Sequence, residues 1–160
     1  MENTISINTG EMAVAKGQIT IETSGIGSCV FVCLHDNINK VGGAVHAMLP
    51  TRVAPKKSDT IVFEESDGVG KYVDEALVKL VDDVVRAGGK KENLRAKIVG
   101  GSSMFKVFDN SKIGNDNVKA AEKILSLLNV DVKAESTGGH VGRSAKFNIG
   151  NGVVEVMVRM

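Results

Sequence analysis

The feature that most constrains the fold is the apolar run at residues 30–34, in which Val, Phe, Val, Cys and Leu follow one another without a polar residue. Such a short, unbroken run is typical of a β-strand that is buried on both faces. Turn-forming residues 36–40 come next, and residues 41–49 then form a second, mostly apolar stretch that ends at Pro50. Because proline cannot donate to a sheet ladder, Pro50 marks the end of that strand. We therefore expect an antiparallel hairpin over residues 30–49.

Two helices are predicted by apolar residues that recur every three or four positions. The first covers about residues 70–87, and Gly88-Gly89 supplies a residue that can turn left-handed at its end. The second helix is expected to begin near Asn115 or Asp116, either of which can cap it. Residues 51–68 are polar with little periodicity, and we interpret them as a long loop of the kind that often serves as a lid or binding loop.

Short apolar or alternating stretches indicate the remaining strands, at residues 18–23, 94–99, 130–134, 145–149 and 153–158. The order strands, helix, strand, helix, strands indicates an α/β protein of the α+β type. We expect a mixed β-sheet sandwich with packed helices, and not a regular βαβ array. A chain of 160 residues is long enough to bury a core, so a single domain over residues 1–160 is expected.

Charge and aromatic content disfavour several classes of partner. The formal net charge is +1 and the Lys and Arg residues are scattered, so there is no basic stripe for nucleic acid. With 5 Phe, 1 Tyr and no Trp, a platform for stacking bases is not expected. The apolar runs are too short to span a membrane, and the first residues lack a secretion signal pattern. The two cysteines then favour a reduced, cytoplasmic protein.

Cys29 carries the strongest chemical signal in the chain. It follows the small-residue stretch 24–28, whose glycines leave the thiol little steric cover against a substrate carbonyl. A thiol with an imidazole beside it is sufficient to open an acyl or amide bond. The alternative is that Cys29, like most free cysteines, is a small buried hydrophobic residue. Cys33, which lies inside the apolar run, fits that description better.

His46 is the candidate base for Cys29. Counting back along the expected hairpin from a turn at residues 37–39 places Cys29 opposite a position near Ala47. His46 would then be a direct or diagonal neighbour of Cys29 across the two strands. The alternative is that His46, which lies among apolar residues, is a buried core histidine with its hydrogen bonds satisfied.

A zinc site competes with thiol catalysis, because the chain contains Cys29, Cys33, His35, His46 and His140. The closely spaced cysteine pairs of structural zinc sites are missing. On one strand Cys29 and Cys33 would lie roughly 13 Å apart at about 3.3 Å per residue, too far for shared ligation or a disulfide. His35 is expected at the hairpin turn, and the pattern does not place His140. We therefore expect no metal and no cofactor.

The glycines beside Cys29 suit one of two uses. The stretch 25–28 lacks the Gly-Lys-Ser/Thr ending of a P-loop and precedes a strand, whereas nucleotide loops open a helix. Backbone N–H groups at Gly27 and Ser28 are instead candidates for stabilising an oxyanion near Cys29. Phe105, which follows another glycine loop, is either a core residue or an anchor for a partner or substrate.

The sequence resembles the CheD family of chemotaxis proteins, which are receptor glutamine deamidases. The resemblance runs over almost the whole chain, and it rests on five ordered blocks whose spacing is kept. These blocks are residues 25–34 around Cys29, 43–50 around His46, 97–105, 113–118 and 137–144.

The resemblance implies a cysteine-hydrolase-like CheD fold and three catalytic residues. The nucleophile of the family falls on Cys29 and its histidine on His46. Its threonine, six positions before the cysteine, falls on Thr23, which is implied to orient the imidazole through a hydrogen bond. The sequence departs from the family at Asp116, where arginine is frequent, a difference that bears on partner affinity.

In the family, glutamines on the cytoplasmic helical bundle of methyl-accepting chemoreceptors are converted to glutamate through a cysteine thioester. The resemblance thus implies this substrate class, and a CheC-type phosphatase as a further partner. Two alternatives stay open. One is a regulatory protein that binds receptors or the phosphatase without turnover, and the other is a different thiol hydrolase acting on esters or small amides in a closed pocket.

Overall fold

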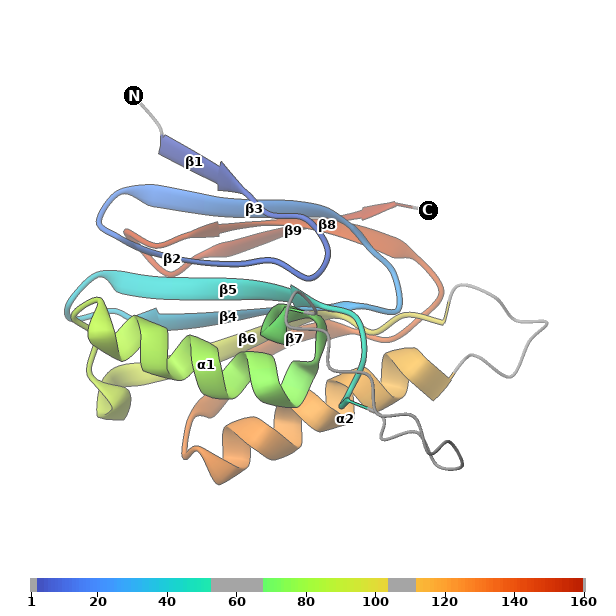
Figure 1. Ribbon diagram of the computed structural model, residues 1–160. Coiled ribbons are helices and arrows are strands. Elements are labelled where there is room, and N and C mark those ends of the chain that lie inside the picture. Colours follow the sequence, from blue (N-terminus) through green and yellow to red (C-terminus); the bar gives the residue numbers. More distant parts are fainter. Residues whose placement is uncertain (1–2, 53–67, 104–111, 160) are drawn as a thin grey trace.

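The computed structural model describes residues 3–52, 68–103 and 112–159, and it has three layers (Figure 1). Two β-sheets are stacked on each other, and two helices cover the outer face of one of them. The helices are α1 (Val73–Arg86) and α2 (Lys112–Leu127), with short 3-10 turns at η1 (Val69–Lys71) and η2 (Lys91–Asn93). The expectation of a mixed sheet sandwich with packed helices is confirmed.

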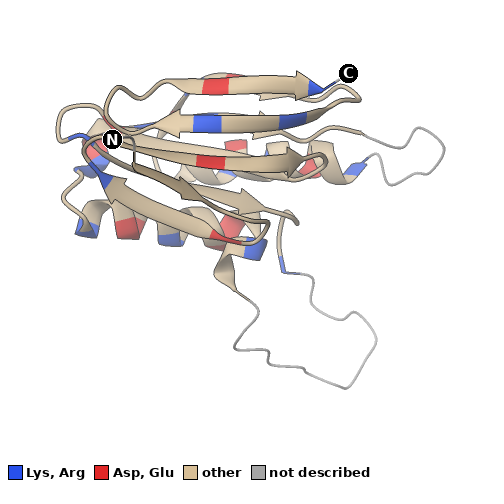
Figure 2. Cartoon of the chain, turned by 90° about the horizontal axis from the view of Figure 1, so that it is seen from above, with Lys and Arg blue, Asp and Glu red and all other residues tan. Residues whose placement is uncertain are grey.

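The upper sheet in Figure 1 has four strands and lies on the side of the lower sheet away from the helices. Its order is β1 (Asn3–Ser6), β3 (Ile19–Ile26), β8 (Gly142–Asn148) and β9 (Val154–Arg159). The pair β1–β3 is parallel, and the pairs β3–β8 and β8–β9 are antiparallel. Figure 2 looks down on this sheet and shows acidic and basic residues interspersed along its strands. Glu22, Lys146 and Glu155 lie in register across three of its strands.

The lower sheet has five strands and lies between the upper sheet and the helices (Figure 1). Its order is β2 (Met12–Lys16), β5 (Val41–Ala47), β4 (Val30–Asp36), β6 (Leu94–Gly100) and β7 (Asp131–Thr137). Only β6–β7 is parallel among its pairs. Strands β4 and β5 form the expected hairpin, with Val30 opposite Ala47 and Asp36 opposite Val41.

Strand β4 is buried on both faces, as its unbroken apolar run predicts. Val30, Val32 and Leu34 belong to the core that the helices cover. Phe31 and Cys33 belong to the second core, which lies between the two sheets. Because side chains alternate along a strand, one short run of residues joins both cores.

Two adjacent glycines of β5 let both neighbouring layers approach closely. A Cβ atom at Gly43 would lie 2.9 Å from Cδ1 of Leu80 on α1. A Cβ atom at Gly42 would lie 3.1 Å from Cζ of Phe147 on β8. Larger residues at these positions would push the helix or the upper sheet away from the strand that carries His46.

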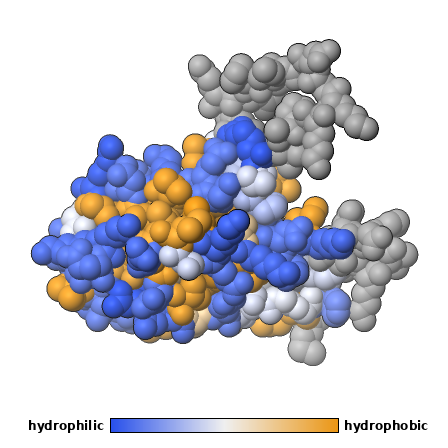
Figure 3. Space-filling model, turned by 90° about the horizontal axis from the view of Figure 1, so that it is seen from below, coloured by the Kyte–Doolittle hydropathy of each residue, from blue (hydrophilic) through white to orange (hydrophobic). Residues whose placement is uncertain are grey.

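Seen from the helix side, the surface is mainly hydrophilic, with apolar side chains gathered in a band (Figure 3). The helices carry the exposed apolar side chains Val78, Val85 and Leu127. None of the helices formed by the described residues is long and apolar enough to cross a membrane.

Several boundaries differ from the sequence-based expectations. Strands β1 and β2 were not predicted, because both are short and largely polar or half-buried. Strand β3 was expected to end at Thr23 but continues into the small-residue stretch 24–28 and ends at Ile26, with an irregular register between Thr23 and Ile26. Helix α2 begins at Lys112, three residues before the predicted cap. The expected loop at residues 51–68 falls mostly, and Phe105 entirely, outside the described residues.

His35 was expected at the hairpin turn, and this prediction is wrong. It lies in β4, where its ring nitrogen Nε2 is 2.8 Å from the Ile149 carbonyl oxygen. The turn begins one residue later, after Asp36, because the carboxylate of Asp36 organises it.

Asp36 is a buried carboxylate that holds the turn of the hairpin together. Its Oδ1 accepts hydrogen bonds from the backbone N–H groups of Ile38 and Asn39, both at 2.9 Å. Its Oδ2 accepts from the Asn39 side chain, the Lys90 backbone N–H and the Asn93 side chain, at 2.8, 2.9 and 3.3 Å. Burial alone would raise the pKa of Asp36, but these donors outweigh burial and hold that pKa well below the usual range.

The substitution Asp36→Asn is expected to lower the free energy of unfolding by about 2–4 kcal/mol at neutral pH, because an amide offers one acceptor oxygen to these donors. A lowered folded-state pKa stabilises the protein above the unfolded-state value of about 3.9 and ceases to do so at lower pH. The difference between variant and wild type should therefore narrow as the pH falls below about 4. Urea unfolding at neutral and acid pH measures both effects, and an equal cost at the two pH values would contradict this account of Asp36.

Candidate active site

The loop Gly27-Ser28-Cys29 connects the upper sheet to the lower one, between β3 and β4. Cys29 is half-buried and its thiol is free. Its carbonyl oxygen accepts a hydrogen bond from the Gly101 N–H at 2.8 Å. A Cβ atom at Gly100 would clash with that carbonyl oxygen, and Gly100 has a φ of 116°, so glycine is required there. The loop is therefore packed directly against the end of β6.

His46 lies on β5 and is completely buried. The register pairs it with Phe31, so Cys29, two residues earlier, is its diagonal neighbour. The count from the sequence was one residue off, because Val30 and not Cys29 lies opposite Ala47. Diagonal neighbours in an antiparallel pair lie roughly 7–8 Å apart, within reach of long side chains.

The backbone of His46 is also fixed on its other side, by the segment before β2. The His46 N–H donates to the Glu11 carbonyl at 3.1 Å, and the Gly10 N–H donates to the His46 carbonyl at 2.6 Å. These bonds continue the β2–β5 ladder, in which Met12 pairs with Val45. The imidazole is thus carried by a strand whose backbone is held from both neighbours.

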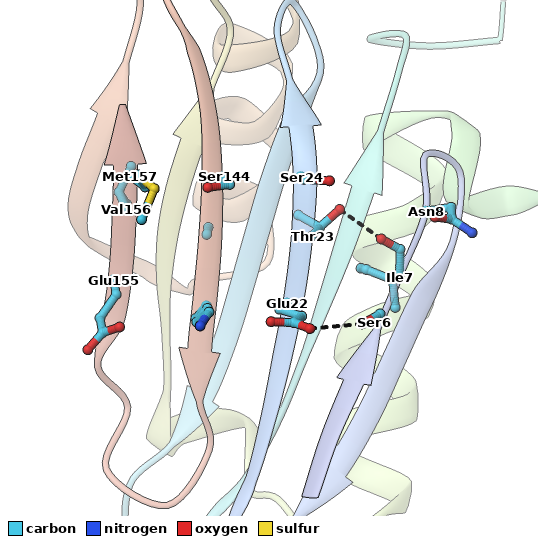
Figure 4. A pocket seen from close by; sticks show the side chains of 12 residues that line it. Ser6, Ile7, Asn8, Glu22, Thr23, Ser24, Ser144, Glu155, Val156 and Met157 are labelled. Atoms are coloured by element: carbon cyan, nitrogen blue, oxygen red, sulfur yellow. Dashed lines mark hydrogen bonds between the residues drawn. The ribbon is translucent and has the colours of Figure 1, made fainter. Parts of the chain in front are cut away.

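Thr23 is buried on β3 and contacts the imidazole across the space between the sheets. Its Oγ1 is 2.8 Å from Nδ1 of His46 and 2.8 Å from the carbonyl oxygen of Ile7. Figure 4 shows the bond to Ile7. The Ile7 carbonyl can only accept, so the single hydroxyl proton of Thr23 goes to it. Thr23 Oγ1 must then accept a proton from His46, which assigns the proton of the neutral imidazole to Nδ1.

With Nδ1 protonated, Nε2 of His46 carries a free lone pair. This atom is buried, and it has no hydrogen-bond partner among the described residues. Burial lowers the pKa of His46, so the imidazole is neutral at neutral pH. A neutral imidazole nitrogen with a free lone pair can act as a general base if the proton to be removed comes within hydrogen-bonding reach.

The thiol of Cys29 is also neutral in the resting protein. Burial raises its pKa, and the hydrogen bond from the Cys29 backbone N–H opposes this with a smaller effect. For a neutral thiol and a neutral imidazole to react, the imidazole would have to take the thiol proton as the sulfur attacks. This differs from a preformed pair of thiolate and imidazolium.

A groove of about 520 Å³ lies on the outer face of the upper sheet (Figure 4). It is bordered by β1, β3, β8 and β9, with Glu22, Ser144 and Met157 among its lining residues. Thr23 also borders it, but neither Cys29 nor His46 does. The groove is therefore distinct from the thiol and imidazole.

Cys33 and His140 have different surroundings from Cys29 and His46. Cys33 is buried in the core between the sheets, and burial raises its pKa strongly. His140 is exposed, with Nδ1 2.8 Å from the Ser103 carbonyl. Within residues 3–52, 68–103 and 112–159, no group of three His, Cys, Asp or Glu side chains is arranged to hold a metal ion.

Two contributors to the site were not recognised in the sequence. The Ile7 carbonyl sets the direction of the Thr23 hydroxyl, but a backbone oxygen leaves no signal in a single sequence. Asn117 on α2 binds the loop that carries Cys29, with its Nδ2 2.9 Å from the Ser28 carbonyl. The sequence could have indicated Asn117, because it is a polar residue at a buried position of an amphipathic helix.

Comparison with known proteins extends over nearly the whole chain. The family model described as CheD chemotactic sensory transduction matches residues 48–158, a range that begins after Cys29 and His46. The probable chemoreceptor glutamine deamidase CheD of Pyrococcus abyssi is 37% identical over 158 residues, covering 98% of this chain and 92% of the relative. The chemoreceptor glutamine deamidase CheD of Thermotoga maritima is 41% identical over 146 residues, covering 91% and 86%.

Among solved structures, the fold is similar to the Bacillus licheniformis hypothetical protein YfiH, with a TM-score of 0.49 and 11% identity over 79% of this chain and 50% of that one. This likeness is too distant to inform the chemistry. The family model and the long matches to relatives above 30% identity agree with each other. The chain belongs to the CheD family of chemotactic sensory transduction proteins.

Proposed function

We propose that this protein is a protein-glutamine deamidase that converts glutamine side chains of chemoreceptors to glutamate. The observation that carries the proposal is the bond between Thr23 and His46, which leaves Nε2 as a free base near a half-buried thiol. The relatives in Pyrococcus abyssi and Thermotoga maritima are named chemoreceptor glutamine deamidases, which supports this substrate class.

In the first step, His46 Nε2 removes the proton from Cys29 as the sulfur attacks the side-chain carbonyl carbon of the glutamine. The carbonyl oxygen becomes an oxyanion, which backbone N–H groups of the loop at residues 27–29 stabilise. Thr23 keeps accepting from Nδ1, so the imidazolium that forms stays in position. His46 then gives its new proton to the amide nitrogen, and ammonia leaves.

The product of this step is a γ-glutamyl thioester on Cys29. A water molecule attacks the thioester carbonyl while His46 Nε2 takes one of its protons. The tetrahedral intermediate collapses, the sulfur leaves and receives the proton, and glutamate is released. One water is consumed and one ammonia is formed, and the enzyme returns to its neutral resting state. No cofactor takes part in this sequence.

The change from glutamine to glutamate adds one negative charge to a receptor helix and removes an amide donor. Both effects alter the packing of a helical bundle, which is how the reaction would tune chemotactic signalling. We place the reaction in the cytoplasm, because the proposed substrate is the cytoplasmic bundle of the receptor. A CheC-type phosphatase is the further partner that the family resemblance implies, and Phe105 stays a prediction for the contact.

We expect Cys29→Ala to abolish deamidation of the cytoplasmic domain of a methyl-accepting chemoreceptor from the same organism. Peptide mass spectrometry detects glutamate in place of glutamine after incubation with the protein. Cys33→Ala is the matched control, because Cys33 is the other diagonal neighbour of His46 in the β4–β5 register but is buried in the core between the sheets. Deamidation by the Cys29→Ala variant would contradict the role of Cys29 as nucleophile. Receptor binding without any wild-type turnover would favour the alternative of a non-catalytic regulatory protein.

The substitution Thr23→Val keeps the shape of the side chain but removes its hydroxyl. We expect kcat to fall roughly 10- to 100-fold, since the imidazole loses the partner that fixes its tautomer. KM should change little, because Thr23 is buried. Thr23→Ser restores the hydroxyl and should retain most of the activity. A Thr23→Val enzyme with wild-type kcat would remove Thr23 from the mechanism.

The pH dependence of thiol alkylation distinguishes a neutral pair from an ion pair. Burial raises the pKa of Cys29 and lowers that of His46, so iodoacetamide should alkylate Cys29 ever faster across the range from about pH 5 to 10. Protonation of His46 removes the base, so the slowest alkylation is expected at acid pH. Site-resolved mass spectrometry separates Cys29 from the buried Cys33. A rate that is already maximal at neutral pH would indicate a preformed thiolate and contradict this assignment.

A further inference from the structure

The carbonyl groups of the Cys29 loop are held by three separate donors. The Gly27 carbonyl accepts from the Ser102 N–H at 2.9 Å, and the Cys29 carbonyl accepts from the Gly101 N–H at 2.8 Å. Between them, the Ser28 carbonyl accepts from Nδ2 of Asn117 at 2.9 Å. Three consecutive carbonyl oxygens therefore face donors from the β6–α2 side of the loop, and only the middle donor is a side chain.

Asn117 also binds the strand that carries the base. Its Nδ2 donates to the Met48 carbonyl at 2.9 Å, two residues beyond His46. An amide nitrogen has two protons, so one goes to the nucleophile loop and the other to the end of β5. Both neighbours of this atom are carbonyl oxygens, which can only accept. The atom is therefore assigned as the nitrogen of the amide and not as its oxygen. Asn117 thus connects the backbone next to Cys29 with the backbone next to His46.

The remaining atom of the Asn117 amide is not satisfied. Its Oδ1 is buried and has no hydrogen-bond partner among the described residues, although the side chain as a whole is completely buried. A buried, unpaired acceptor lowers the stability of the folded protein, and an apolar residue at the same helix position would avoid this cost. Retention of a costly polar group at a core position is expected where the group has a functional role.

The planar geometry of the peptide group determines what the hydrogen bond from Asn117 to the Ser28 carbonyl controls. A peptide is planar, and in its usual trans form the N–H points opposite to the C=O. Holding the Ser28 carbonyl toward Asn117 therefore turns the N–H of Cys29 to the opposite side. In this orientation the N–H can donate to a group on the side of the loop away from Asn117.

We propose that Asn117 is a positioning residue that holds the Ser28–Cys29 peptide with its N–H directed at the oxyanion of the tetrahedral intermediate. This inference rests on the proposed deamidase function and adds a residue to it. Without the bond from Asn117, the Ser28 carbonyl loses its partner and the peptide is free to rotate, because small residues precede it. A rotated peptide would present a carbonyl oxygen, and not an N–H, to the developing negative charge.

Two rates measured on the same samples test the proposal. Deamidation develops an oxyanion, whereas alkylation of Cys29 by iodoacetamide displaces iodide at a saturated carbon and develops none. We expect Asn117→Ala and the isosteric Asn117→Asp to lower kcat for receptor deamidation roughly 10- to 100-fold, as expected for a misdirected oxyanion donor. The alkylation rate and KM should stay close to the wild-type values, since the thiol, the base and Thr23 are unchanged.

Asp36→Asn is the matched control, because it loosens buried hydrogen bonds at the opposite end of β4. When measured below its unfolding temperature, the Asp36→Asn variant should deamidate the receptor and be alkylated at Cys29 at the wild-type rates. A deamidation rate unaffected by the Asn117 substitutions would overturn the proposal. So would equal losses of deamidation and alkylation, which would indicate a disordered loop. Absence of receptor deamidation by the wild type, with Cys29 still alkylated, would overturn the proposed function itself and this role with it.

Discussion

The candidate site depends on the single proton of the Thr23 hydroxyl. Two groups compete for Oγ1 at 2.8 Å, and the Ile7 carbonyl can be satisfied only if it receives that proton. The imidazole of His46 must then donate from Nδ1, which leaves Nε2 free. A threonine can thus fix a histidine tautomer without placing a charge in the core. An aspartate in its place would bring a buried negative charge beside Ile7.

This constraint explains why the site lies at the junction of the two sheets. Thr23 comes from the upper sheet, His46 from the lower one, and Cys29 from the loop between them. Each sheet is held in place by other layers, the lower one by the helices and the upper one by the core between the sheets (Figure 1). The relative positions of the three side chains therefore depend on how the two sheets and the helices pack together. The glycines at residues 42–43 contribute by allowing that close packing.

Much of the site could be predicted from the sequence because the central hairpin is local. The apolar run at residues 30–34 and the turn after it placed Cys29 near His46, with an error of one residue in the register. The error arose because the turn spans four residues, 37–40, between the paired Asp36 and Val41, and not the three residues 37–39. Asp36 holds this turn with five hydrogen bonds, which involve residues as distant as Asn93. Such long-range contacts are not visible in a local pattern.

Other parts could not be derived from the pattern of residues. Thr23 lies on a half-buried strand like many threonines, and only the family resemblance indicated its role. Strand β1 was missed because its four residues are mostly exposed, and its parallel pairing with β3 joins residues 16 positions apart. Helix α2 was predicted to start at Asn115 or Asp116, but these residues lie inside it, where tertiary packing outweighs their preference for a cap.

The most direct test of this account is the protonation state of His46. Long-range proton–nitrogen correlation spectra of protein with ¹⁵N-labelled histidine report separately on Nδ1 and Nε2 of each imidazole. The account predicts that at neutral pH His46 carries one proton, on Nδ1, and that Thr23→Val removes this preference while His35 and His140 keep their signals. A proton on Nε2, or a doubly protonated imidazolium at neutral pH, would contradict the central role assigned to Thr23.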